Sequence, residues 1–477
     1  MLKACRKAFG HAYRCFVRSL TPLAMDFRET PSTKEMTLIA WGGPLSTDIA
    51  LIPKAHAGDD LIVANYCGLK KEDKFMSKQT MVAKRMDEIA FAGIRKVFEK
   101  ANKLAAQGVK VIHFEIGRPD FDTPPHIKQA AKTALDQGHV HYAPNIGVPG
   151  LRRALADQIR QDKGVTYDPD QEIIVTAGGQ EAMYLTLMSI LDPGDEVLVP
   201  NPGFGPFFSA VRLAGGVPVG VDLVPNDNFI FDFAAAEQAV TSRTKAIIVN
   251  SPHNPTGSVL TKEQLEQVAN FAVKHDLILI SDEAYDRMLY DGSVHYSPAS
   301  FPGMRARTII CGSLSKTYAM TGWRIGYIAG PEQIINAAVR LQQNIMLSLC
   351  TFAQIGASAG LTASQECVET MMQEFARRRK LVLGMIKQIP GFELETIPNG
   401  AFYVFPKVSL SRASSGKLAD YLLDKTGVAT VDGASFGSRG EGYLRISYAV
   451  SYEDCQEGLE RIGEAMTQLM HGKATLD

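Results

Sequence analysis

The chain has 477 residues, of which 45% are hydrophobic and 21% charged, a composition typical of a globular protein large enough for two or three domains. Its 50 Lys and Arg residues against 51 Asp and Glu residues leave a formal net charge of −1, which argues against general attraction to nucleic acid or to an anionic membrane. The seven cysteines are scattered without a CxxC pair, so we expect neither a disulfide framework nor a zinc site, and a cytoplasmic location. No apolar run reaches the roughly 18 residues that a membrane-spanning helix needs.

The first 75 residues differ from the rest of the chain. Residues 1–25 contain five basic residues and no acidic one, and their apolar residues recur at near-helical spacing. A basic amphipathic helix of this kind resembles a presequence for import into a mitochondrion or another organelle, which is the alternative to the cytoplasm. Residues 26–75 show no sustained periodicity and no catalytic motif. We therefore expect 1–75 to be a poorly ordered extension that contributes little to the core.

From about residue 88 onward, helical and strand patterns alternate, which indicates an α/β fold with a mostly parallel sheet. Segments such as 262–275 and 332–344 predict helices between the strands, and a long charged helix is predicted at 371–389, followed by two short strands and a final helix. Continuous apolar runs predict strands buried on both faces at 172–176, 196–199, 246–249, 277–280, 308–311 and 325–329.

The first of these strands leads into Gly178, Gly179 and Gln180 at the start of a predicted helix. Two glycines at a helix start allow backbone amides to approach a phosphate, and the helix dipole favours the anion. A tight strand-to-helix turn explains the same residues without any ligand. For this segment taken alone, the turn is the simpler interpretation.

Two further motifs follow strands of the same series. Asn254 lies between Pro252 and Pro255, which restrict the backbone around its amide. Asp282 stands at a strand end, where a buried carboxylate requires a cationic partner. A protonated pyridinium nitrogen would be such a partner, and capping of the following helix is the alternative role. Because open α/β sheets bind ligands at the carboxyl ends of their strands, both residues are candidates for one site.

The segment from Ser313 to Arg324 is the most informative in the chain, because it places Lys316 among hydroxyl residues with a fixed cation shortly after it. A lysine amine is a useful nucleophile when it lies beside a carbonyl group and is partly deprotonated. A lysine that forms an imine, hydroxyl donors and an arginine are together what pyridoxal phosphate requires for its Schiff base and its phosphate. Taken alone, the motif leaves open an ordinary surface lysine.

In this order, the motifs resemble those of the class I/II aminotransferases, which are pyridoxal-phosphate enzymes of fold type I, and most of all the branch of aspartate and aromatic aminotransferases. The resemblance extends from about Phe114 to Tyr448 and includes the segments 115–124, 142–147, 399–403 and 443–448.

The resemblance implies a large cofactor-binding domain at 129–365, with a mostly parallel, seven-stranded sheet flanked by helices. A smaller α+β domain would combine both chain ends, with its N-terminal part at 76–128 and its C-terminal part at 366–477. It also implies a homodimer.

Roles at the cofactor follow from the same resemblance. Lys316 would form the Schiff base, Asp282 would pair with the pyridine nitrogen, and Tyr285 and Asn254 would hydrogen-bond the ring 3′-oxygen. Phe204 would stack on the ring, although better-known relatives often have Trp or Tyr there, and a core phenylalanine is the alternative. The phosphate would be held by Gly178, Gly179, Gln180, Ser313 and Arg324, and by Tyr142 of the neighbouring subunit.

The substrate would be bound by Arg445, Asn254 and Gly117. Arg445 alternates with apolar residues on a predicted strand, so it lies on the opposite face, and its planar guanidinium suits a bidentate carboxylate. A surface salt bridge is the alternative. The resemblance assigns the substrate α-carboxylate to Arg445 and the mouth of the site to Gly117.

The expected function is amino transfer between an L-α-amino acid and a 2-oxo acid (2-oxoglutarate or pyruvate), with ping-pong kinetics and a role in amino acid metabolism. Aspartate or glutamate is a weak preference as amino donor. Residues 312–317 superficially resemble a P-loop, but Ser315 stands where that motif requires Gly. A transcription regulator is disfavoured, because residues 1–75 contain no recognisable helix-turn-helix pattern. The runner-up is β-elimination from a cysteine conjugate on the same fold, since fold does not fix the reaction.

Overall fold

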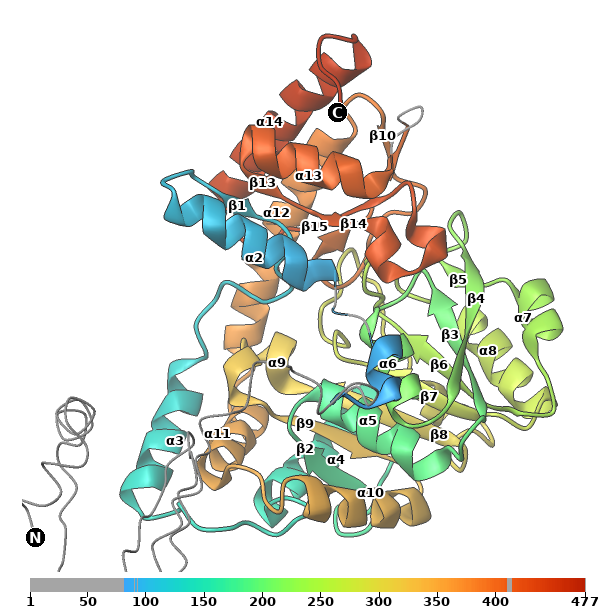
Figure 1. Ribbon diagram of the computed structural model, residues 1–477. Helices are drawn as coiled ribbons and strands as arrows, with labels where there is room; N and C mark the ends of the chain where they lie inside the picture. Colours follow the sequence, from blue (N-terminus) through green and yellow to red (C-terminus); the bar gives the residue numbers. More distant parts are fainter. Residues whose placement is uncertain (1–80, 90, 92, 410–413, 477) are drawn as a thin grey trace, which may run out of the picture. The chain divides into compact units, whose positions relative to one another are not determined.

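The computed structural model describes residues 81–89, 91, 93–409 and 414–476 (Figure 1). The expectations for 1–75, including the basic helix and the extension, lie outside these ranges. No helix within them is long and apolar enough to cross a membrane.

The largest element is an eight-stranded sheet with the order β2-β9-β8-β7-β6-β3-β4-β5 (Figure 1). The neighbouring strands from β8 to β4 are parallel, whereas β9 is antiparallel to both β2 and β8, and β5 is antiparallel to β4. All six strands expected from the sequence are present, and the mostly parallel α/β architecture is confirmed. The count exceeds the expected seven because of the two-residue edge strand β5. The strands are β2 (Ile173–Thr176), β3 (Glu196–Asn201), β4 (Val217–Val224), β5 (Ile230–Phe231), β6 (Thr244–Asn250), β7 (Ile278–Asp282), β8 (Thr308–Ser313) and β9 (Gly326–Ala329).

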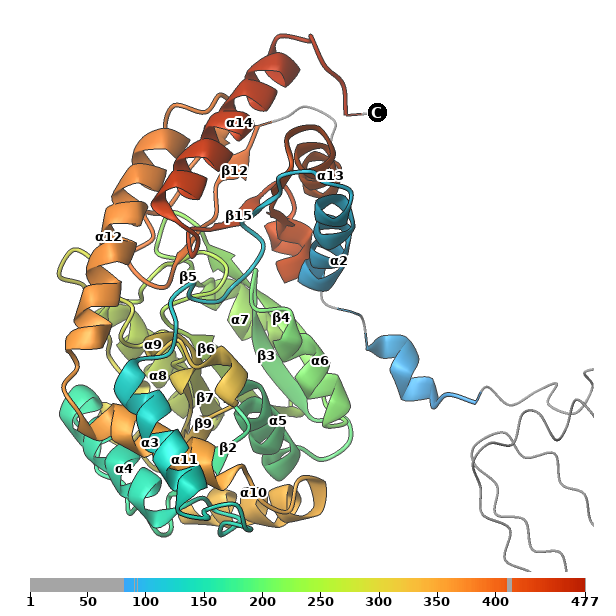
Figure 2. The same cartoon turned by 90° about the vertical axis from the view of Figure 1, so that its left-hand side faces the viewer.

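Helices cover both faces of this sheet, because successive side chains of a strand point to opposite sides. In β6, Ile247 and Val249 pack with α7 and α8, whereas Ala246 and Ile248 pack with α5, α6 and α10. At the other end of the sheet, α3, α4 and α11 lie side by side over β2, β8 and β9 (Figure 2). These helices are α3 (Pro125–Asp136), α4 (Pro149–Lys163), α5 (Gly179–Ile190), α6 (Pro206–Leu213), α7 (Phe233–Ala239), α8 (Lys262–Lys274), α10 (Glu332–Ile345) and α11 (Thr351–Thr362).

A second group of elements combines segments from both ends of the described chain. The strand β1 pairs in parallel with β13, and β15 lies between β11 and β14 in a small antiparallel sheet. The group consists of α2 (Gly93–Ala106), β1 (Ile112–His113), α12 (Glu366–Ile386), β10 (Phe392–Glu393), β11 (Tyr403–Val404), β12 (Lys407–Val408), α13 (Ser415–Thr426), β13 (Val428–Ala429), β14 (Val431–Asp432), β15 (Leu444–Ser447) and α14 (Tyr452–Met470). The domain boundaries given above stay a prediction.

The remaining helices are short. They are η1 (Lys84–Glu88), η2 (Pro298–Ser300), α9 (Leu314–Thr317), η3 (Thr321–Trp323), η4 (Gly433–Phe436) and η5 (Ser438–Gly440). Of these, α9 matters most for the site, because it begins directly after β8 and contains Lys316.

Candidate active site

The candidate residues gather at the carboxyl edge of the large sheet. Asn250 at the end of β6 lies beside Asp282 at the end of β7, and Asp282 lies beside Cys311 of β8. Further along the same edge, both Thr176 of β2 and Ser313 of β8 are paired with Gly326 of β9. This is the edge at which open α/β sheets bind ligands.

Lys316 projects from the first turn after β8. Its Nζ donates a hydrogen bond to the carbonyl oxygen of Gly117 at 2.5 Å, and it lies 6.0 Å from the ring centroid of Tyr285. Desolvation by burial, together with the cations of Arg445 and Arg324, lowers the pKa of the Lys316 amine to about 8. A far larger share of this amine is therefore neutral near physiological pH than in an ordinary lysine, as a nucleophile or a base requires.

Asp282 carries a carboxyl group that is desolvated and has no ion-pair partner in the described part of the chain. Its Oδ1 accepts a hydrogen bond from the backbone N–H of Ala284 at 3.1 Å. Desolvation by burial, assisted by the neighbouring carboxylate of Glu283, raises the pKa of this carboxyl to about 7. A cation placed beside Asp282 would restore its charged form.

Arg445 lies on β15 with only 1% of its surface exposed. Its Nη1 donates to Oδ1 of Asn254 at 3.3 Å, and its Nη2 donates to the carbonyl oxygen of Glu115. The Nε is buried without a hydrogen-bond partner, and no carboxylate of the described residues forms an ion pair with the guanidinium. A buried cation with unused donors is suited to an anionic ligand. The predicted alternative, a surface salt bridge, does not match this burial.

Tyr285 follows β7 and is buried. Its hydroxyl forms a hydrogen bond of 2.8 Å with the hydroxyl of Tyr403, a residue of β11. Desolvation raises the pKa of Tyr285 well above its usual value, so its hydroxyl stays protonated and can donate. Lys316, Asp282, Tyr285 and the Arg445–Asn254 pair thus come together from distant parts of the sequence.

Four of the residues expected at a phosphate lie close together where α5 begins. Gly178 adopts a φ of 83°, and a Cβ there would lie 2.4 Å from Nη2 of Arg324. The Arg324 guanidinium donates to the carbonyl oxygens of Thr321 at 3.0 Å and of Ala177 at 2.9 Å. A Cβ at Gly179 would lie 3.4 Å from Cβ of Ser313. Glycine at 178 therefore permits both the positive φ and the close approach of the Arg324 guanidinium to the backbone.

The other two assignments from the same chain are less defined in their contacts. Gln180 is exposed in the first turn of α5. Phe204 is half-buried, with its ring 5.5 Å from that of Phe207 in an edge-to-face arrangement. The contact with Phe207 gives Phe204 a place in the core cluster beside α6, and its stacking role stays a prediction.

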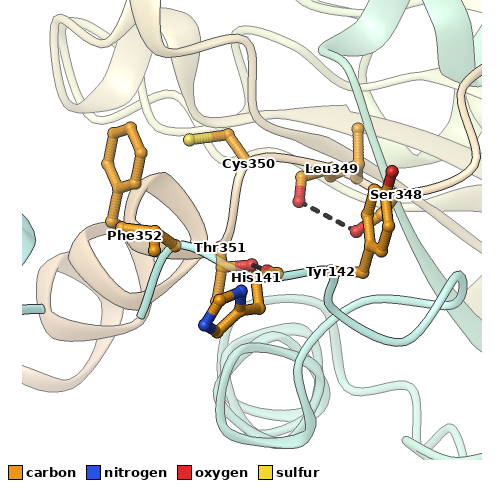
Figure 3. A pocket seen from close by; sticks show the side chains of 8 residues that line it. His141, Tyr142, Ser348, Leu349, Cys350, Thr351 and Phe352 are labelled. Carbon is orange, nitrogen blue, oxygen red and sulfur yellow. Dashed lines mark hydrogen bonds between the residues drawn. The ribbon is translucent and has the colours of Figure 1, made fainter. Parts of the chain in front are cut away.

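Tyr142 lies elsewhere on this chain, with 82% of its surface exposed. It lines a surface pocket together with His141, Ser348 and Cys350 (Figure 3). A hydrogen bond fixes the loop that contains Tyr142: Thr351 Oγ1 donates to the carbonyl oxygen of His141 at 2.6 Å. No hydrogen bond in the described part of the chain joins Tyr142 to another predicted site residue.

Residues 109–462 match the family model for aminotransferase class I and II. The chain belongs to this family. An aspartate aminotransferase from Pyrococcus abyssi is 44% identical over 387 residues, covering 80% of this chain and 98% of that protein. Aromatic-amino-acid aminotransferase 2 from Thermococcus litoralis is 42% identical over 388 residues, with the same shares covered. The solved structure of Thermus thermophilus aspartate aminotransferase with maleate has a TM-score of 0.77 and 40% identity, covering 81% of this chain and all of that chain.

The resemblance seen in the sequence is thereby confirmed, and the chain is an aminotransferase. The alternative of a β-eliminating lyase on the same fold finds no support among these relatives.

Three contributors to the site were not expected from the sequence: Tyr403, the amide of Asn250 and the carbonyl group of Glu115. Asn250 accepts from the backbone N–H of Asn254 at 3.0 Å and so fixes that loop. Tyr403 belongs to a segment that carried the family resemblance, which was the only signal for it. A backbone carbonyl leaves no mark in a sequence at all.

Proposed function

We propose that this aminotransferase binds pyridoxal 5′-phosphate and that Lys316 holds it. One observation carries the proposal: three matching features lie at a single sheet edge. They are a lysine amine with a pKa of about 8, a desolvated carboxyl group at Asp282 without an ion-pair partner among the described residues, and a helix start where the Arg324 guanidinium packs against Gly178. They correspond to the aldehyde, the pyridine nitrogen and the phosphate of the cofactor.

When bound, pyridoxal phosphate supplies an electron sink that stabilises negative charge at the substrate Cα. Asp282 would hold the proton on the ring nitrogen, which strengthens that sink. Tyr285 would donate to the ring 3′-oxygen, as would the Nδ2 of Asn254, whose Oδ1 already accepts from Arg445. Ser313 and Arg324 would contact the phosphate, with Gln180 beside them.

The proton at Cα is assigned to Lys316. Once the incoming amino group has taken its place, the neutral Lys316 amine would accept the Cα proton as general base and later return it as general acid. The carbonyl oxygen of Gly117, 2.5 Å from Nζ, would keep the amine close to this position. Arg445 would bind the α-carboxylate through the donors that no described residue uses.

Position 117, at the mouth of the site, has no room for a side chain. A Cβ there would lie 2.4 Å from the Tyr403 hydroxyl, so any larger residue would displace that ring. For the substrates, we propose an acidic or aromatic L-α-amino acid as donor and 2-oxoglutarate or pyruvate as acceptor. The names of the relatives from Pyrococcus abyssi and Thermococcus litoralis support this choice.

The cofactor proposal is tested by adding pyridoxal phosphate to the purified protein, reducing with borohydride and mapping the modified peptide by mass spectrometry. We expect the mass of the reduced cofactor on Lys316. Modification at another lysine, or none, would overturn the assignment. A screen of amino donors against 2-oxo acids then identifies the substrates, and release of ammonia in place of a new amino acid would point to elimination.

We further propose a homodimer in which Tyr142 reaches the phosphate of the neighbouring site. The support is its exposure of 82% and the exposed apolar side chains of Val140, which lines the same pocket, and of Ile345, Met346 and Leu347, which directly precede Ser348 of that pocket. Mixing Tyr142→Ala with Lys316→Ala chains tests this sharply. In a mixed dimer, one site regains both residues only if Tyr142 acts across the interface, so activity should rise above that of either parent. No gain in a mixture shown to contain mixed dimers would contradict the proposal.

For the location, the cytoplasm remains our proposal. The described cysteines Cys311, Cys350, Cys367 and Cys455 are all free thiols, as expected in a reducing compartment. Import into an organelle with cleavage near residue 25, detected by the N-terminal sequence of the mature protein, would replace it.

A further inference from the structure

Tyr403 is a buried residue outside the expected set that touches two of the residues proposed to act in the site. It is 1% exposed and lies on β11, next to β15, the strand that carries Arg445. Its hydroxyl is 2.8 Å from that of Tyr285, and the guanidinium carbon of Arg445 lies 4.6 Å from its ring centroid. One side chain therefore contacts both the residue proposed for the cofactor oxygen and the residue proposed for the substrate carboxylate.

Hydrogen-bond arithmetic gives the Tyr285–Tyr403 contact a direction. Within the described residues, the Tyr285 hydroxyl bonds only to the Tyr403 hydroxyl, and the Tyr403 hydroxyl bonds only to that of Tyr285. The two hydroxyls carry two hydrogens, but the bond between them uses one. If Tyr285 donates its hydrogen to an oxygen of the cofactor, the hydrogen between the two rings must come from Tyr403. A donor aimed at the Tyr285 oxygen polarises its O–H group and makes it a stronger donor in turn.

The surroundings hold Tyr403 in this position. Its ring packs against Phe402 at 4.8 Å and edge-to-face against Tyr285 at 5.8 Å. The absence of a side chain at Gly117 leaves room for its hydroxyl, since a Cβ there would lie only 2.4 Å away. The hydroxyl is thus confined between the Gly117 backbone and Tyr285.

We infer that Tyr403 is a positioning residue: its hydroxyl orients and strengthens the Tyr285 hydrogen bond to the cofactor, and its ring braces Arg445 for the carboxylate. This inference rests on the proposed function. It assigns two separable effects to two parts of one side chain. The hydroxyl acts on the cofactor, and the aromatic face acts on substrate binding.

The hydroxyl effect is tested with Tyr403→Phe, by titrating the visible absorbance of the bound cofactor against pH. Weaker donation from Tyr285 to the ring oxygen favours protonation of Nζ of Lys316, the nitrogen bonded to the cofactor, so the titration midpoint should rise by about 0.5 pH unit. The double variant Tyr285→Phe, Tyr403→Phe should have the same midpoint as Tyr285→Phe alone, because the Tyr285 hydroxyl through which Tyr403 acts is already absent. An unshifted midpoint in Tyr403→Phe, or equal shifts in both backgrounds, would overturn the inference.

The ring effect is tested by comparing Tyr403→Phe with Tyr403→Leu. The phenyl ring preserves the contact with Arg445, so Tyr403→Phe should keep a nearly normal KM for the amino acid. Tyr403→Leu should raise that KM about threefold to tenfold. Equal KM values in the two variants would remove the ring from the inference.

Tyr290→Phe is the matched control. The Tyr290 hydroxyl donates to the carbonyl oxygen of Ala401 at 2.6 Å in the same core, so the loss of one buried hydroxyl is equivalent, but Tyr290 makes no contact with Tyr285 or Arg445 among its hydrogen bonds. Its midpoint should match that of the unmodified enzyme. Absence of any cofactor absorbance in the unmodified protein would refute the proposed function. A normal absorbance band whose pH midpoint is unchanged in Tyr403→Phe would refute only this inference.

Discussion

Two consecutive acidic residues at the end of β7 have pKa values shifted in opposite directions: burial raises that of Asp282, whereas that of Glu283 is lowered. The pKa values of two buried lysines are also shifted in opposite directions, downward for Lys316 and upward for Lys163. Glu283 forms an ion pair with Lys163, whose Nζ is 2.5 Å from Oε2, and their side chains are 0% and 1% exposed. Among the described residues, the Asp282 carboxyl has one hydrogen-bond partner, a backbone N–H, and the Lys316 amine has one, a backbone carbonyl oxygen. Burial alone therefore does not distinguish a functional charge from a structural one.

The difference lies in how completely each charge is satisfied. Glu283 accepts hydrogen bonds from Ser281, Ser297 and His295 in addition to Lys163. Although desolvation raises its pKa, the Lys163 ammonium and His295 hold it far below the usual value. Desolvation lowers the pKa of Lys163, but the carboxylates of Asp286 and Glu283 raise it well above that of an ordinary lysine. The Lys163–Glu283 pair is satisfied by residues of the chain itself, whereas we propose that a ligand supplies the partners of Lys316 and Asp282.

The largest effect is expected at Lys316. Lys316→Ala removes the only amine assigned to hold the cofactor and to accept the Cα proton, so turnover and the visible absorbance of the bound cofactor should both be abolished. Steady-state assays and an absorbance spectrum measure this. Full activity in the variant would end the proposal for Lys316.

Asp282→Ala should lower turnover by several orders of magnitude while the cofactor stays bound, because the ring nitrogen loses the group that keeps it protonated. The free energy of unfolding without cofactor should not fall, since a desolvated carboxyl without an ion-pair partner is removed. Turnover at the unmodified rate with cofactor bound would show that Asp282 does not pair with the nitrogen.

Lys163→Met, unlike Asp282→Ala, should mainly lower the free energy of unfolding. It leaves the Glu283 carboxylate buried without its main cation, so this free energy should fall by about 3–5 kcal/mol in a denaturant titration. Adding Glu283→Gln should recover part of this loss. The control is Lys274→Met, which breaks an exposed pair with Glu237 and should cost less than about 1 kcal/mol. Equal losses of unfolding free energy in Lys163→Met and Lys274→Met would contradict the distinction between the buried and the exposed ion pair.

Arg324→Ala should mainly weaken retention of the cofactor, by about 10- to 100-fold in its dissociation constant, because a charge-assisted contact to phosphate is lost. Fluorescence titration with pyridoxal phosphate gives the constant. At saturating cofactor, kcat should change far less. Unchanged affinity would remove Arg324 from the phosphate site.

The smallest effect is expected from shortening the chain to begin at Met76. All predicted site residues lie after Phe114, and the compact unit that contains them begins at Gln79. The shortened chain should fold, dimerise and bind cofactor like the full one, as judged by circular dichroism, light scattering and absorbance. Loss of folding would show that residues before 76 pack as part of the smaller group of elements.

Much of the fold and of the candidate site could be predicted, because both are encoded in local patterns. The strands β2, β3, β6, β7, β8 and β9 are short apolar runs, and the motifs of Asn254, Asp282 and Lys316 follow three of them directly. The strand β4 was missed because only Val221 and Leu223 of its eight residues are buried and because it includes Pro218 and Gly220. A pattern of that kind lacks the continuous apolar run of a central strand.

The contacts between distant segments could not be predicted. The bond between Tyr285 and Tyr403 joins residues 118 positions apart, and the bond between Lys316 and Gly117 spans 199 positions. Neither depends on a motif, because the acceptor or partner is defined only by how the two groups of elements pack. Roles that rest on such contacts need the structure.

The link between Arg445 and the carbonyl group of Glu115 spans 330 positions, almost the whole described chain. During synthesis, the sheet edge with Asp282 and Lys316 leaves the ribosome long before β15 does. A nascent chain can therefore assemble the large sheet first, while the arginine proposed for the carboxylate arrives 129 residues after Lys316. Chains released early would retain Lys316 but lack the arginine that we propose binds the amino acid.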